Sequence, residues 1–353
     1  MVLKFKDMRY FFIFYLIFTF GVLPSYCKEI KSLNTDGILY LTSPDTGEII
    51  YVDLNDLSMI NHIQTTGAPW EITSDKTNMI LLVTDFAKDK IYLLNPLNDL
   101  ITKSIALPLM SSPKDIELSD DGSLAYILES LANEFVVYNL KEEKIIIKTK
   151  TPPGPANFSV LKGEKLIAIS CPAINSIAFL NLETFSPAHR IEVKDSPENL
   201  LADNLRNVLY ITNRTGNKIS VFDPKNKENN KTIEVGETPV SFALDEKNNL
   251  LYVGNGKSNN ISIIDITKGE VTDTIQLPVE TQFPGDLEIT DDSKWLIVTS
   301  ETTNFISIID LNLKKPAIKL DVGVSTHAAL IIDKADRQMG KESLSKEKIN
   351  DTK

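Results

Sequence analysis

The sequence predicts an all-β fold, a seven-bladed β-propeller of four-stranded blades, from three observations. One residue position recurs seven times along the 353 residues, at steps of 42 to 45. Two further positions stay in fixed register with it, and each repeat contains short apolar runs of strand type separated by turn residues. Repeats of about 40–45 residues with four strands apiece are typical of propeller blades.

Three columns of residues define the repeat. The first lies inside an apolar strand and is occupied by Tyr40, Leu82, Tyr126, Ala168, Tyr210, Tyr252 and Ile297. The second is an acid or amide 13 residues later in every copy: Asp53, Asn95, Asn139, Asn181, Asp223, Asp265 and Asp310. The third is a proline 13 residues before the next first-column residue: Pro69, Pro113, Pro155, Pro197, Pro239 and Pro284, with Thr326 in the seventh place.

A fourth column, six residues before each acid, holds Gly47, Asp89, Asn133, Asn175, Asn217, Asn259 and Asn304. Gly, Asn and Asp are the residues that best tolerate positive φ, so a hairpin turn between the second and third strands explains the column. A row of asparagines that binds a sugar or a peptide is the alternative interpretation.

The two ends of the repeat region predict how the ring closes. Residues 38–41 form a second strand with no first strand before them, and residues 327–332 form a first strand with no second strand after them. The C-terminal strand therefore completes blade one, which removes the open sheet edges. The predicted domains are a signal peptide at 1–27, the propeller at 28–333 and a charged flexible tail at 334–353.

The first 27 residues have the features of a secretory leader. Lys4, Lys6 and Arg9 precede an uncharged apolar run of 14 residues at 10–23, short of the ~18 needed to cross a bilayer. Ser25 and Cys27 are small enough for the cleavage site, so we expect cleavage before Lys28. A lipoprotein acylated on Cys27 and an uncleaved anchor are the alternatives. All three place the mature chain outside the cytoplasm, in the periplasm, on the cell surface or secreted.

Composition and charge narrow the classes of partner. A formal net charge of −11 disfavours nucleic acid and an anionic membrane surface, both of which are bound through basic surfaces. No stretch after the leader is long and apolar enough to span a membrane. With Cys27 removed, Cys171 has no partner for an intramolecular disulfide, and we expect it to be a small buried residue.

The first column resembles the repeat of the YVTN-type β-propellers. Tyr210-Ile211-Thr212-Asn213 differs from Tyr-Val-Thr-Asn by one conservative change, whereas Ala168-Ile169-Ser170-Cys171 departs most. The resemblance covers residues 38–332 and implies a propeller fold and an exported protein. The wider set of similar propellers includes lactonase-like enzymes and haem d1-type domains. The resemblance supplies no catalytic residue for this chain.

One constellation of polar residues is expected at a mouth of the central channel. Two residues after the proline column come Glu71, Asp115 and Asp286, and His327 lies one position earlier in the blade-one strand. Carboxylates and an imidazole on one arc could bind a ligand or cation, or position a water. The alternative is a polar mouth whose carboxylates cap local backbone amides. We expect these carboxylates to be exposed, so that their amides fold almost as well.

Two insertions also favour this channel mouth as the binding face. The acid-to-proline distance is 16 in most repeats, but 18 before Pro113 and 19 before Pro284. The added residues lengthen loops leading into inner strands, and binding often uses loops on a rigid scaffold. The added residues include Leu109, Met110, Thr281, Gln282 and Phe283, and Trp70 lies on the same side. Exposed Met and aromatic side chains suit an interface, and loop variation without function is the alternative.

The sequence thus predicts an exported binding or scaffolding propeller that takes a protein or small ligand through Glu71, Asp115, Asp286, His327, Trp70 and Phe283. A lactonase-like or other hydrolase that uses the acidic and histidine arc is the alternative. A haem d1-like domain is a weaker third, since the chain has only 3 histidines. We expect a monomer without a cofactor. No catalytic residue can be assigned, and a metal remains an open question.

The leader interpretation predicts the mature N-terminus. Expressed in a bacterium that exports it, the protein should begin at Lys28 and carry no lipid, because Ser25 and Cys27 meet the small-residue requirement while the bulky Tyr26 disfavours acylation of Cys27. Intact-mass and N-terminal peptide mass spectrometry measure this. A diacylglyceryl group on Cys27 would refute it.

Overall fold

The computed structural model describes residues 31–75, 80–226 and 230–333. The chain divides into two compact units, Met1–Ile30 and Lys31–Lys353, and every described residue belongs to the second. The predicted leader at 1–27 and tail at 334–353 lie outside the described residues. No helix in the described part of the chain is both long enough and apolar enough to cross a membrane.

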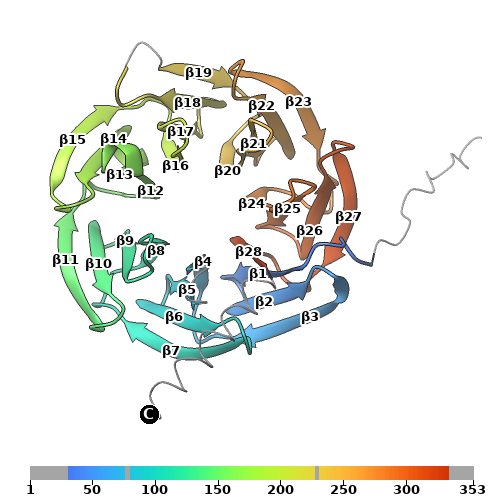
Figure 1. The fold of residues 1–353 in the computed structure, drawn as a ribbon, viewed down its shortest axis with the longest axis horizontal. Helices are drawn as coiled ribbons and strands as arrows, with labels where there is room; N and C mark the ends of the chain where they lie inside the picture. Colours follow the sequence, from blue (N-terminus) through green and yellow to red (C-terminus); the bar gives the residue numbers. More distant parts are fainter. Residues whose placement is uncertain (1–30, 76–79, 227–229, 334–353) are drawn as a thin grey trace, which may run out of the picture. The chain divides into compact units, whose positions relative to one another are not determined.

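The described residues form seven four-stranded antiparallel sheets arranged as blades around a central channel (Figure 1). Blade 1 contains β28 (Ala329–Asp333), β1 (Gly37–Ser43), β2 (Glu48–Asp53) and β3 (Asp56–Gln64). Blade 2 contains β4 (Pro69–Asp75), β5 (Ile80–Asp85), β6 (Lys90–Asn95) and β7 (Leu100–Ala106). Blade 3 contains β8 (Pro113–Leu118), β9 (Leu124–Glu129), β10 (Glu134–Asn139) and β11 (Lys144–Lys150).

The remaining blades repeat this order from the channel outward. Blade 4 contains β12 (Phe158–Leu161), β13 (Leu166–Cys171), β14 (Ser176–Asn181) and β15 (Pro187–Glu192), with short 3-10 helices η1 (Lys162–Glu164) and η2 (Pro172–Ile174). Blade 5 contains β16 (Pro197–Asp203), β17 (Val208–Asn213), β18 (Lys218–Phe222) and β19 (Lys231–Glu234). Blade 6 contains β20 (Pro239–Asp245), β21 (Leu250–Asn255), β22 (Asn260–Asp265) and β23 (Glu270–Gln276). Blade 7 contains β24 (Pro284–Ile289), β25 (Trp295–Ser300), β26 (Phe305–Asp310) and β27 (Lys315–Asp321).

The predicted closure of the ring is confirmed. Strand β28 pairs antiparallel with β1, and the register matches Ile38 with Ile332 and Tyr40 with Leu330. Blade 1 therefore combines one strand from the end of the propeller with three from its beginning, and Figure 1 shows the red β28 beside the blue β1. This pairing satisfies backbone groups that an open sheet edge would leave free.

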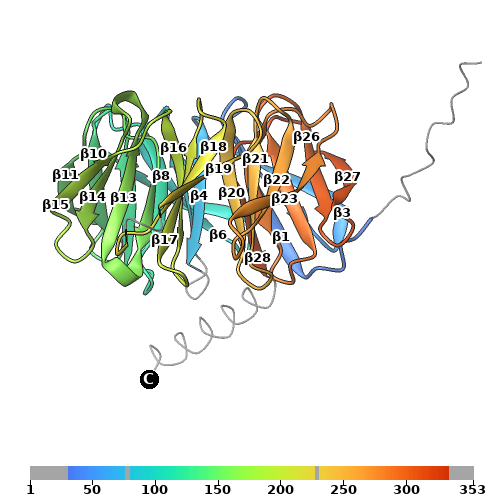
Figure 2. The same ribbon diagram turned by 90° about the horizontal axis from the view of Figure 1, so that it is seen from above.

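Packing between blades explains which strands are apolar throughout and which alternate. Second strands such as β5 and β9 are buried at every position but the first, because both faces of each blade pack against neighbouring blades. Outermost strands such as β7 and β11 alternate between exposed and covered side chains. Seen from the side, the inner strands run from one face of the ring to the other (Figure 2).

The residues of the acid and turn columns each stabilise a local turn of the backbone. Asp265 accepts N–H bonds from Thr267 and Lys268 at 2.9 and 3.1 Å, an Asx turn that ends its strand. The hairpin column adopts positive φ at its first six positions, from Asn259 at 49° to Gly47 at 73°. Their side chains also support the next loop, since Asn217 Oδ1 accepts the Thr238 N–H at 3.0 Å. The hairpin-turn interpretation of this column is therefore confirmed.

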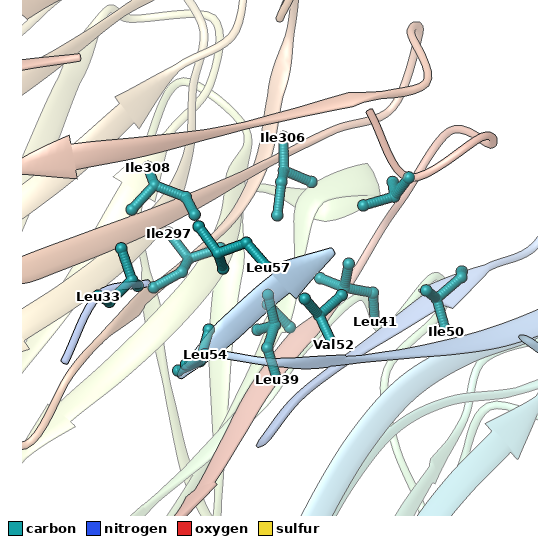
Figure 3. Close-up of a cluster of buried hydrophobic side chains, with 12 residues drawn as sticks. Leu33, Leu39, Leu41, Ile50, Val52, Leu54, Leu57, Ile297, Ile306 and Ile308 are labelled. Carbon is teal, nitrogen blue, oxygen red and sulfur yellow. The ribbon is translucent and has the colours of Figure 1, made fainter. Parts of the chain in front are cut away.

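The core lies between blades. One cluster joins blade 1 to blade 7, where Leu39 and Val52 pack with Ile297 and Ile308, all fully buried (Figure 3). Burying an aliphatic side chain of this size contributes about 1.5–3 kcal/mol. The seam between the first and last blades is thus held by apolar packing as well as by β28.

The closure predicts a sharp effect of truncation. Deleting the chain from Thr326 onward should remove the inner strand of blade 1, leave β1 with a free edge, and abolish a single cooperative thermal transition. A chain ending at Asp333 keeps β28 and is the control. Circular dichroism melting compares the two, and a Thr326 truncation that melts like the control would disprove the role of this strand.

Candidate functional site

In five of the seven inner strands, a β-bulge at the start of the strand orients the residues that reach the channel; these strands are β4, β8, β16, β20 and β24. In β4 the register shifts between Pro69 and Ile72, so that two residues oppose one on β5. The bulged N–H of Glu71 is satisfied by the Thr84 hydroxyl at 2.9 Å. The same pair recurs as Asn199 with Thr212 at 2.8 Å and as Asp286 with Thr299 at 2.7 Å.

Two of the predicted carboxylates join consecutive inner strands. Asp115 accepts the N–H of Ile116 in its own strand and that of Phe158 in blade 4, both at 2.8 Å. Asp286 accepts the N–H of Leu287 at 2.8 Å and that of Ala329 in blade 1 at 3.0 Å. These bonds fit the alternative of carboxylates that cap backbone amides.

The expectation that these carboxylates are exposed was wrong. Asp115 is 6% exposed, and neither Glu71 nor Asp286 is an exposed residue. The reason for Asp115 and Asp286 is the bulge, which turns these side chains toward backbone amides of the next blade instead of outward to solvent. Replacing Asp115 or Asp286 with its amide would put an NH₂ donor where a carboxylate oxygen now accepts a hydrogen bond. Such a variant would therefore destabilise the fold, whether or not it also affected ligand binding.

Glu71 differs from its two partners. Its Oε1 accepts the N–H of Ile72 at 3.2 Å, and within the described residues no bond carries it to blade 3. Glu117, two positions after Asp115 on β8, has no hydrogen-bond partner in that same part of the chain. Both side chains line the channel. Neither side chain therefore joins its blade to the next one within the described chain.

All six predicted residues line one cavity of about 670 Å³: Trp70, Glu71, Asp115, Phe283, Asp286 and His327. The Trp70 and His327 rings lie 3.9 Å apart between centroids, and His327 Nδ1 lies 3.0 Å from Glu301 Oε1. Phe283 adopts a φ of 54° in the longer loop before β24. The six residues singled out from the sequence therefore lie around one cavity.

Other lining residues were missed by the sequence analysis. Glu117 and Glu288 lie two positions further along their strands, and alternation in a strand puts them on the same face as Asp115 and Asp286. That alternation was the signal that could have found them. Lys114 lines the channel as well, and Arg214 binds Glu198 there with N–O distances of 2.9 and 3.1 Å.

The channel carboxylates hold their protons more tightly than free ones. Burial, followed by the charges of Asp115 and Asp286, raises the pKa of Glu71 well above its ordinary value. Burial and Asp115 raise the pKa of Glu117 to about 8, and burial raises the pKa of Asp115 to about 6 against its backbone hydrogen bonds. The pKa of Asp286 is raised by burial as well. The cause throughout is desolvation of like charges in one enclosed space.

The other residues that could bind a metal or act as a nucleophile do not lie together. His62 and His189 lie on the outer strands β3 and β15, and His189 stacks on Phe179 at 4.4 Å between centroids. Cys171 is fully buried, and burial raises its thiol pKa to about 11, which disfavours the reactive thiolate. Over residues 31–333, apart from the gaps at 76–79 and 227–229, no three His, Cys, Asp or Glu side chains are grouped to hold a metal ion.

The propeller geometry agrees with a comparison against known families. A family model described as lactonase, 7-bladed beta-propeller matches residues 59–276. The chain belongs to this family. The match spans parts or all of blades 1 to 6, so this lactonase-family propeller shares its repeat with the family over most of the ring.

Solved structures show the same fold at low sequence identity. A functionally unknown protein from Desulfotomaculum acetoxidans is 13% identical, with a TM-score of 0.69 over 84% of this chain and 99% of its own. The dihydro-heme d1 dehydrogenase NirN in complex with DHE is 12% identical, with a TM-score of 0.67 over 89% and 78%. Kuenenia stuttgartiensis hydrazine synthase is 15% identical, with a TM-score of 0.58 over 71% and 81%. No curated protein matches this lactonase-family chain.

A further acid lies beneath the lengthened loop that leads into β8. Glu129 at the end of β9 is 0% exposed, and neither of its carboxylate oxygens has a hydrogen-bond partner within the described residues. Burial raises its pKa to about 7; Lys148 and the nearby Ser111 hydroxyl oppose the rise, and Glu134 and Asp89 add to it. The corresponding Asp85 of blade 2 accepts the N–H groups of its hairpin instead.

Glu129→Gln should stabilise the protein in a pH-dependent way. A raised native pKa means that the native state keeps the Glu129 proton where the unfolded chain has lost it. Stability is therefore lost as pH rises from about 4.5 to about 7. The variant should match the wild type near pH 5 and exceed it near pH 8 by on the order of 1–3 kcal/mol. Urea unfolding at both pH values measures the difference.

Glu134→Gln on the adjacent strand is the matched control. The pKa of Glu134 is lowered, chiefly by its hydrogen bond with Lys150, so its amide should destabilise the protein near pH 8. Equal effects of the Glu129 substitution at both pH values would contradict the burial of a protonated acid there.

Proposed function

We propose that this protein is an exported binding propeller whose ligand enters the mouth of the central channel and presents a cationic group to Glu71 and Glu117. The observation that carries the proposal is that, among the described residues, the side chains of Glu71 and Glu117 make no hydrogen bond to the next blade, while Asp115 and Asp286 are tied to its backbone amides. A carboxylate that does not join two blades can bind a ligand at less cost to the fold.

The charges of the channel favour a cation over an anion. Arg214 is paired with Glu198 and His327 with Glu301, which leaves Lys114 as the cation facing several carboxylates among the described lining residues. A bound ammonium or guanidinium would relieve the repulsion that raises the pKa of Glu71. Trp70 adds an aromatic face, which attracts organic cations.

The location and repeat type belong to the same proposal. The leader at 1–27 supports export, and Tyr210-Ile211-Thr212-Asn213 with Tyr252-Val253-Gly254-Asn255 supports a YVTN-type repeat within the lactonase family. A protein outside the cytoplasm meets peptides, polyamines and cell-envelope components, all of which include cationic groups.

Hydrolysis of a lactone is the second candidate function, favoured by the family to which the chain belongs. Glu71 has the property of a general base, since burial and the charges of Asp115 and Asp286 raise its pKa well above the ordinary carboxylate value. His327 lies 3.0 Å from Glu301 Oε1, with its ring tilted against that of Trp70, and it would serve as the orienting or proton-transferring group.

Glu71→Gln tests the binding function. Isothermal titration with lysine amide, arginine amide and choline should give binding to the wild type and at least tenfold weaker binding to the variant, because one charge-assisted contact is lost. Affinity should rise with pH as Glu71 and Glu117 lose their protons. Glu142→Gln, an exposed acid on a turn between outer strands, is the control and should bind like the wild type.

The same proteins distinguish the second candidate. Release of acid from aliphatic γ- and δ-lactones, followed by pH-stat, should be absent if the protein only binds. Lactone hydrolysis that Glu71→Gln abolishes, without cation binding in the wild type, would reject the binding proposal in favour of the hydrolase.

A further inference from the structure

Exposed apolar side chains gather on the mouth face of the propeller. Inner strands begin at this face, so the loops entering them and the turns between second and third strands lie on it. Among the described residues, the large apolar side chains exposed there are Phe86, Leu109, Met110, Leu131, Ile174 and Val279, whereas the opposite face has Leu205 and Leu313. Grouped apolar exposure of this kind marks interaction surfaces.

Four of these side chains lie on neighbouring loops of blades 2 and 3 and are called the apolar rim: Phe86, Leu109, Met110 and Leu131. Met110 donates its N–H to Asp89 Oδ2 at 2.9 Å, which ties it to the hairpin that bears Phe86. Leu131 donates its N–H to the Ser111 carbonyl at 3.3 Å. The rim therefore crosses from blade 2 to blade 3.

The lengthened loop at residues 107–112 holds the rim in place. Asp89 Oδ1 accepts the Ser112 N–H at 2.8 Å, and the Ser130 hydroxyl donates to the Ser112 carbonyl at 3.0 Å. Despite this anchoring, Leu109 is 91% exposed and Met110 is 67% exposed. The loop thus presents its apolar side chains to solvent in a fixed arrangement instead of folding them inward.

Holding these apolar side chains in solvent makes the loop at residues 107–112 less stable. Met110 and Ser112 adopt φ of 66° and 46°, a region that residues with a Cβ seldom occupy. Glu129 is buried beneath the loop without a hydrogen-bond partner in the described chain. Strain that surrounding bonds maintain is typical of functional positions, and a loop selected for stability alone would have buried Leu109.

The rim is continuous with the acidic channel. The ring of Phe86 lies 5.4 Å from that of Trp70, and Trp70 lies beside His327 at the channel mouth. A ligand that touches the rim and extends across Trp70 would therefore reach Glu71, which follows Trp70 in β4.

We propose that the apolar rim and the acidic mouth together bind a polypeptide segment in which a lysine or arginine is flanked by apolar residues. The basic side chain enters the channel toward Glu71, and the apolar neighbours pack on Leu109, Met110 and Leu131. The charged half of this surface rests on the binding function proposed above, whereas the rim is an independent observation. Apolar contacts supply affinity, and the charge sets register and orientation.

Charge complementarity selects this occupant. Two copies of this chain facing each other across a two-fold axis would bring one acidic mouth against another, which opposes association. An anionic membrane is repelled for the same reason, with a net charge of −11 on the full chain. A basic and apolar peptide matches both halves of the surface.

A displayed library of random 12-residue peptides, selected on the immobilised protein, tests the proposal. Enriched peptides should carry Lys or Arg next to Leu, Ile, Phe or Trp. As synthetic peptides they should bind in fluorescence anisotropy at least tenfold more weakly to the Leu109→Ser/Met110→Ser variant. Leu205→Ser/Leu313→Ser on the opposite face, of similar exposure at 69% and 60%, is the matched control and should bind normally.

The outcomes separate the two proposals. Peptides that depend on Glu71 but not on the rim pair would reject the rim and leave the channel function intact. Peptides that depend on the rim pair but carry no basic residue would reject the charged half. No enrichment, or a dimer in sedimentation that the rim substitutions dissociate, would overturn the inference.

Discussion

The arrangement of the site depends on one backbone feature, the bulge at the start of the inner strands. Two residues there oppose one, and the bulged N–H would be orphaned inside the channel wall without a partner. A threonine hydroxyl on the neighbouring strand supplies that partner, as Thr84 does for Glu71. In blades 1 and 7 the hydroxyl also donates to the next blade, since Thr299 binds the His327 carbonyl at 2.8 Å. One small side chain therefore fixes both the aim of a channel residue and the spacing of two blades.

Much of the fold could be predicted because its columns answer local backbone needs. An acid at a strand end makes an Asx turn, as Asp265 does, and a positive φ selects Asn, Asp or Gly, as at Asn217. Such needs recur wherever the same turn recurs, so they appear in the sequence at fixed spacing. The order of the strands and the closure by β28 follow from that spacing, whereas the bounds do not, since the strand expected at 327–332 is Ala329–Asp333.

The site was predictable in position but not in chemistry. Asp115 and Glu71 occupy the same column, yet Asp115 spans to Phe158 in the next blade while Glu71 does not. That difference depends on contacts some 43 residues apart, which no local pattern records. Thr281 shows the same limit: it lies in a lengthened loop expected to be exposed, but it is fully buried against Ser307, 2.8 Å away.

The origin of β28 governs the order in which the ring can be made. During synthesis, blade 1 holds three strands until residues 329–333 have left the ribosome, although blades 2 to 7 already have all of theirs. The ring can therefore close around the channel only after residues 329–333 are available. Until then the blades can form at most an open array, in which the carboxylates of the future channel are still reached by water.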